Sequence, residues 1–179
     1  GHSNTAVGYK SLYTSEPGTD GTGDNTALGY LAGALLSSGL DNTIIGSEAM
    51  SAGTITASNN TAVGRSSLKA LVSGSSNTAI GYQAGISLTT GGKNCTLGSK
   101  AGYSSTGDDN NVYIGADSAV YTFGSSNVAI GKEALLGATF NDATCDYNAG
   151  GTADPTVTCD ANTSIIVGLG VSGSLIPAG

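Results

Sequence analysis

A five-residue phrase recurs along most of the chain and constrains the fold more than any other feature. Each copy begins with Asn, continues with small or branched residues and ends in Gly, as in Asn77-Thr78-Ala79-Ile80-Gly81. The closing glycines of the eight copies are Gly8, Gly29, Gly46, Gly64, Gly81, Gly98, Gly115 and Gly131. Most successive glycines are 17 residues apart, with single steps of 21, 18 and 16. A motif repeated at this short step predicts a solenoid in which each repeat forms one coil.

Positions two to four of the phrase are predicted to form a short strand that is apolar on both faces. Position four is always a branched aliphatic residue, such as Ile45, Ile80, Ile114 and Ile130, and position two is usually Thr. Position three points the other way and is mostly Ala. A strand that is apolar on both faces is usually buried on both. One face can fill the coil, whereas the other needs a second surface, which predicts an oligomer.

We expect positions two and four to face the interior of the coil. The change Ile80→Asp would then place an unpaired charge in the core and cost several kcal/mol, on the order of 4. Flat rows of Thr on solenoids can also bind ice. Because the position-two Thr residues share a face with the aliphatic row, we interpret them as interior and do not favour ice binding.

After each Gly we expect a second short strand, so that a coil of about 17 residues carries two strands and two turns. The remaining Ser, Thr, Gly, Asp and Asn residues suit turns. The chain is therefore predicted to be an all-β, parallel β-solenoid over residues 1–135. Residues 136–161 are interpreted as an irregular loop, and residues 162–179 as a terminal coil with an uncharged tail.

The charge pattern argues against two classes of partner. The formal net charge is −7, and the six Lys and Arg residues are dispersed. Nucleic acids and anionic membrane surfaces need a clustered basic face, so neither is an expected partner. No uncharged run is long and apolar enough to predict membrane insertion. The chain begins at Gly1, close to the first repeat, and we expect a segment of a longer polypeptide or a processed product.

Catalysis and metal binding are not predicted. His2 is the single His and lies at the chain end, which removes Ser-His-Asp and Cys-His schemes. No carboxylate pair recurs on a buried face, as glycan hydrolysis would need, and Asp117 and Glu133 occupy predicted exposed positions. The segments 20–24 and 107–111 offer oxygen ligands for Ca²⁺, but Asp and Asn are also typical of turns. We expect no cofactor.

Cysteines and tyrosines supply the remaining candidates. Cys145 and Cys159 could form a disulfide, which would contribute about 3 kcal/mol; the alternative is two buried thiols. Cys95 takes position two and is expected to be a small buried residue. Tyr9, Tyr30 and Tyr82 share the place after the Gly. Exposed Tyr can stack on sugars or fill a partner's pocket, but we favour packing between coils.

The phrases at residues 76–81 and 126–131 resemble the head repeats of trimeric autotransporter adhesins and tail-fibre repeats of bacterial viruses. The resemblance covers residues 4–135 and, more weakly, residues 162–168, which form a ninth copy that is longer by two residues. It implies a left-handed β-roll, a side-by-side homotrimer and a role in attachment, outside the cell or on a virion. The chain is accordingly interpreted as a non-enzymatic fibre segment that binds copies of itself and an unidentified cell-surface receptor or glycan. The alternative is an extracellular filament subunit that polymerises end to end through its open solenoid ends. A glycan depolymerase is a third class.

Overall fold

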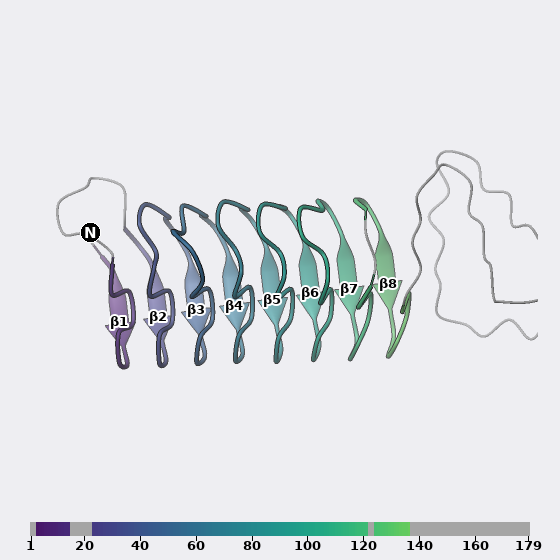
Figure 1. Cartoon of the computed structure of the whole chain (residues 1–179), viewed down its shortest axis with the longest axis horizontal. Helices are drawn as coiled ribbons and strands as arrows, with labels where there is room; N and C mark the ends of the chain where they lie inside the picture. The colour runs from purple at the N-terminus through teal and green to yellow at the C-terminus, as the bar shows by residue number, and fades with distance from the viewer. Residues whose placement is uncertain (1–2, 15–22, 122–123, 137–179) are drawn as a thin grey trace, which may run out of the picture.

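The chain forms a parallel β-solenoid, as the repeat predicts. A computed structural model describes residues 3–14, 23–121 and 124–136. Its eight strands form one parallel sheet in the order β1 to β8, with about seven turns of roughly 17 residues and no helix in the described ranges. The strands stand in a row along the long axis (Figure 1). They are β1 (Thr5–Val7), β2 (Thr26–Leu28), β3 (Thr43–Ile45), β4 (Thr61–Val63), β5 (Thr78–Ile80), β6 (Cys95–Leu97), β7 (Val112–Ile114) and β8 (Val128–Ile130).

Neighbouring strands pair position by position, so equivalent residues of successive coils lie beside one another. In the first pair, for example, Thr5 lies opposite Thr26 and Val7 opposite Leu28. The glycines that follow the strands therefore stack in a column. A Cβ atom built on Gly29 would lie only 2.7 Å from the carbonyl group of Gly46, and its φ of +140° also disfavours other residues. Close backbone approach thus explains why Gly returns in every coil.

Position three of strands β2 to β8, rather than positions two and four, is buried in the interior. Ala79 is fully buried, whereas Ile80 is 38 % exposed and Val7 is 55 % exposed. The expectation that the Thr and aliphatic rows fill the coil is therefore wrong for the single chain. The physical reason is the narrow interior of the coil. Large side chains enter it from the opposite wall, so the strand has room for a small inward residue such as Ala.

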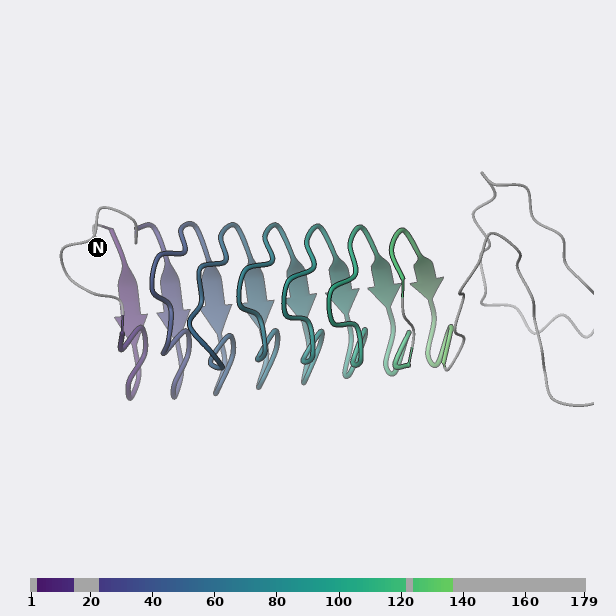
Figure 2. The same cartoon turned by 45° about the horizontal axis from the view of Figure 1, so that its top comes forward.

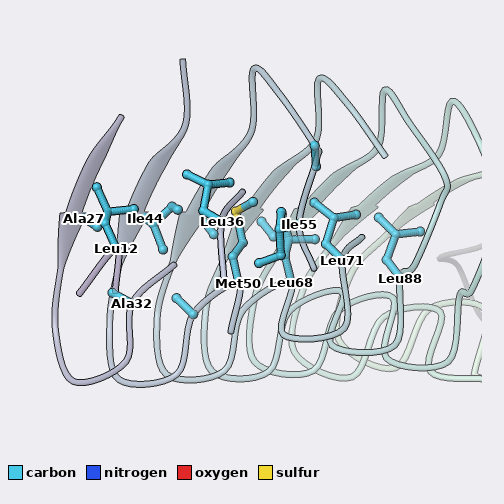
Figure 3. Close-up of a cluster of buried hydrophobic side chains, with 14 of the residues drawn as sticks. Leu12, Ala27, Ala32, Leu36, Ile44, Met50, Ile55, Leu68, Leu71 and Leu88 are labelled. Carbon is cyan, nitrogen blue, oxygen red and sulfur yellow. The ribbon is translucent and has the colours of Figure 1, made fainter. Parts of the chain in front are cut away.

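That opposite wall contributes large side chains in four successive coils, with Met50 and Leu68 adding to the main row. The side chains of the main row lie along the interior (Figure 3), and they belong to Leu36, Ile55, Leu71 and Leu88. In the next coil Ser105 takes this place, and the bulk is supplied instead by Tyr113 at position three of β7. Gly102 leaves room for the ring, because a Cβ there would lie 2.9 Å from Cδ2 of Tyr113. A large side chain on the strand thus compensates for small residues on the opposite wall, which keeps the interior filled.

The expected second strand is replaced by a run of turns, visible below each arrowhead in Figure 2. Counting each coil from its Asn, positions seven and nine have left-handed backbone, as in Lys10 (φ 53°) and Leu12 (φ 48°). Two such residues so close together prevent an extended strand. Hydrogen bonds still join the coils here, since the N–H of Leu68 donates to the Ala84 carbonyl at 3.0 Å. Nothing in the local propensity of Lys, Glu or Gln predicts this conformation.

Several predicted features lie outside the described residues. They are the Cys145–Cys159 disulfide, the terminal coil at 162–179, His2 and all but Leu136 of the 136–161 loop. In the ranges that are described, no helix has the length and apolar character needed to cross a membrane.

Candidate functional site

The candidate site is the outward face of the sheet, which we define as positions two and four of the eight strands. Position two is Thr in β1 to β5, and the last three strands carry Cys95, Val112 and Val128. Position four is aliphatic throughout: Val7, Leu28, Ile45, Val63, Ile80, Leu97, Ile114 and Ile130. None of these sixteen side chains carries a charge at neutral pH, in a chain whose net charge is −7. The outward face is therefore an uncharged strip on an acidic molecule.

The outward face is exposed and regular. Its position-four side chains are exposed or half-buried in every coil, and each lies beside its counterpart in the next strand. With a spacing of about 4.8 Å between paired strands, the strip is roughly 34 Å long. Isolated apolar side chains are normal on protein surfaces, but a continuous apolar strip usually marks an interaction site.

A buried row of asparagines holds the start of every strand in register. The side-chain Oδ1 of Asn25 accepts hydrogen bonds from the backbone N–H and the Nδ2 of Asn42, both at 2.9 Å. Asn42 Nδ2 also donates to the Ala57 carbonyl at 2.9 Å. The backbone link repeats from Asn4 to Asn127. An Asn just before a strand is also typical of a turn, but its return at the same place in eight coils is the sequence signal of a ladder.

The outward placement changes how two predictions are interpreted. The Thr row lies on the outward face, so burial does not exclude ice binding. However, the row stops at Thr78, and every Thr lies two residues from a bulky aliphatic side chain, so an apolar interface describes the face better. Cys95 lies between Thr78 and Val112 on this face and is half-buried rather than enclosed.

The three tyrosines named as possible contacts are all exposed, and two of them meet. The rings of Tyr9 and Tyr30 stack across neighbouring coils, with centroids 5.6 Å apart and planes 9° apart. Tyr82 lies further along the row, beneath the guanidinium of Arg65 at 5.9 Å. Packing between coils therefore accounts for Tyr9 and Tyr30, which follow the outward face at its edge.

Charged residues lie on the turns. Lys69 Nζ approaches Glu48 Oε2 at 2.7 Å, and this contact lowers the pKa of the Glu48 carboxyl. The pKa of Lys132 is raised by its hydrogen bond to Glu133, at 3.0 Å. In the candidate Ca²⁺ segment at 107–111, Asp108 Oδ1 accepts from the Gly124 N–H and Asp109 Oδ1 from the Gly92 N–H. Residues 20–22 of the other candidate segment lie outside the described residues.

Both of those Asp side chains thus serve the turns. Moreover, the described ranges contain no group of three or more His, Cys, Asp or Glu side chains placed to hold a metal ion.

Among the described residues, one titratable group is buried inside the coil. Tyr113 is 1 % exposed, and burial raises its pKa to about 12. Its hydroxyl lies beside Ser105 and Asn127, yet it makes no well-aligned hydrogen bond with any described residue. The hydroxyl therefore adds a desolvation cost to a ring that otherwise fills space.

Comparison of the chain with known protein families, with curated proteins and with solved structures finds no match.

Proposed function

We propose that this chain is a structural segment of a trimeric β-solenoid fibre, which attaches to a host or neighbouring cell surface from outside the cell or from a virion. The proposed role is mechanical. Stacked coils give a stiff rod, and the turns present variable side chains to a partner. The observation that carries the proposal is the uncharged outward face, which runs over all eight strands.

A second copy of the chain is the occupant that fits this face best. Every strand offers the same pair of positions at the same spacing, so two faces can pack along their full length in register. Covering the exposed aliphatic side chains would contribute about 25 cal/mol for each Å² removed from water. An isologous or cyclic arrangement closes without leaving a further apolar surface.

Three copies are proposed because of the resemblance to trimeric adhesin heads and tail-fibre repeats. Each rod has one outward face, so three rods can direct their faces toward a common axis. In that arrangement the turns at positions six to eleven stay on the outside, where they can contact a receptor.

Light scattering on the purified chain tests the assembly. We expect a mass three times that of the chain, and we expect the double variant Ile80→Asp with Ile114→Asp to be monomeric, because it places charges in the interface. Ser99→Asp places a carboxylate at an exposed position after the glycine column and should leave the trimer intact. A wild-type chain that remains monomeric at high concentration would overturn the proposal.

The second candidate is a filament subunit. Within the described ranges, β1 and β8 each pair with one strand only, and such edges can accept a further strand. Electron microscopy separates the two, because a fibre segment gives discrete short rods whereas polymerisation gives filaments of indefinite length.

A further inference from the structure

A hollow of about 390 Å³ opens on the turns of the last three described coils, those of β6, β7 and β8. Its lining comes from two rows. Position seven of each coil contributes Lys100, Asp117 and Glu133, and position ten contributes Tyr103, Val120 and Leu136, with Tyr121 beside them. The hollow is therefore a groove along the solenoid axis with one charged wall and one aromatic or aliphatic wall.

Backbone hydrogen bonds between coils hold both walls in place. On the charged wall the N–H of Asp117 donates to the Ser99 carbonyl at 2.8 Å, and on the apolar wall the N–H of Ser104 donates to the Val120 carbonyl at 3.0 Å. The groove is therefore formed in advance of any ligand, which lowers the entropic cost of binding.

The same two rows are bridged in earlier coils. The Lys69–Glu48 ion pair connects position ten of one coil with position seven of the coil before it. In the first coil, Lys10 Nζ lies 4.9 Å from the centroid of Tyr13, again across the two rows. In the last three described coils the hollow is open, and there Tyr121 is 58 % exposed and Leu136 is also exposed.

We propose that this groove binds a neutral saccharide. A sugar ring has an apolar face of C–H groups and a rim of hydroxyls, which match an aromatic wall opposite carboxylates and an ammonium. The volume lies within the range of small-molecule sites. Lys100 and the adjacent Lys132, which pairs with Glu133, balance the two carboxylates, so the groove has no net positive charge to favour an acidic sugar. The assignment rests on the attachment role proposed above, since it names the class of ligand through which the fibre would attach.

Saturation-transfer NMR on the full chain tests the assignment with neutral trisaccharides of glucose, galactose and N-acetylglucosamine, each at about 10 mM, a concentration that detects a millimolar Kd. We expect at least one to bind. The variants Tyr121→Ala and Glu133→Ala should each weaken that binding about tenfold. Tyr82→Ala, which removes an exposed ring outside the groove, should not. Circular dichroism checks that all three variants fold.

Failure to bind any of the three sugars would overturn the assignment, and so would an equal loss in Tyr121→Ala and Tyr82→Ala. Stronger binding of a trisaccharide that contains glucuronic acid would contradict the charge argument. The fibre proposal is tested separately by mass. A trimer without sugar binding refutes the groove alone, whereas a sugar-binding monomer refutes the fibre alone.

Discussion

The side-chain oxygen of Asn60 accepts two hydrogen bonds from Asn77, one from its backbone N–H at 2.9 Å and one from its Nδ2 at 3.1 Å. Asn77 Nδ2 donates a second bond, to the Gly91 carbonyl at 2.9 Å. The amide therefore links three segments of chain from a position that is almost completely buried. A side chain in this row must offer two donors and an acceptor, which only an amide of this length supplies.

The change Asn77→Asp should destabilise the fold by about 4 kcal/mol at neutral pH, because a buried carboxylate would face two acceptors. Burial raises the pKa of the introduced carboxyl. The cost should therefore shrink as the pH falls below that raised pKa, since the protonated group can donate one hydrogen bond. Chemical denaturation at several pH values measures this. Asn110→Asp, at an exposed turn position, is the control and should change little; equal effects would contradict the ladder's importance.

The glycine column should tolerate no side chain. A Cβ at Gly81 would lie 2.6 Å from the carbonyl carbon of Gly98, at a φ of +139°. We expect Gly81→Ala to cost about 4 kcal/mol, because neighbouring coils would have to separate. Gly107→Ala is the matched control, since its Cβ would meet only the flexible Thr90 side chain, 3.3 Å away. If the Gly81→Ala protein had the same melting temperature as the wild type, the coils could not be this closely stacked.

Tyr113 should make stability depend on alkaline pH. Its pKa is raised to about 12 in the folded chain, against about 10 in an unfolded one. The neutral ring's contribution is complete below pH 10 and is lost as the pH rises toward 12, by up to about 2 kcal/mol.

Tyr113→Phe removes this term. The variant should match or exceed the stability of the wild type near neutral pH, because the hydroxyl has no well-aligned partner among the described residues. Its advantage should grow above pH 10, which unfolding curves at neutral and alkaline pH would measure. A constant difference between the two proteins would contradict the burial of this group.

The repeat predicts the stacking of coils well, because glycine spacing follows directly from how closely backbones approach. It does not predict which strand face points inward. Alternation separates the faces, but here both are apolar, and the narrow interior selects Ala79 over Ile80. The prevalence of Ala at position three was a signal of that width. The sequence does not predict the turn conformation either, since the left-handed residues Glu48 and Gln83 are held by backbone hydrogen bonds to the preceding coil rather than by local propensity.

Ala79 and Ile80 should therefore respond oppositely to the same substitution. Ala79→Asp places a charge in the closed interior and should abolish folding or cost about 4 kcal/mol. Ile80→Asp places it on the outward face, where a single chain keeps it in water, and should weaken association while the circular dichroism spectrum is retained. Melting curves at low protein concentration, where chains are dissociated, make the comparison. Similar losses of thermal stability in both variants would show that position four lies in the core.

Cys95 offers a direct probe of whether the outward face is covered in solution. In a single chain Cys95 is half-buried on the outward face, so we expect a reagent to reach its thiol. In the proposed trimer it faces the common axis, so it should react with N-ethylmaleimide only when chains separate. Mass spectrometry of the Cys95 peptide should show labelling at least about tenfold slower in the wild type than in the Ile80→Asp, Ile114→Asp variant. Both proteins should label at the same rate in denaturant, which controls for intrinsic reactivity. Equal native rates would mean that the face is open, and the partner that covers it would then have to be something other than a second copy of the chain.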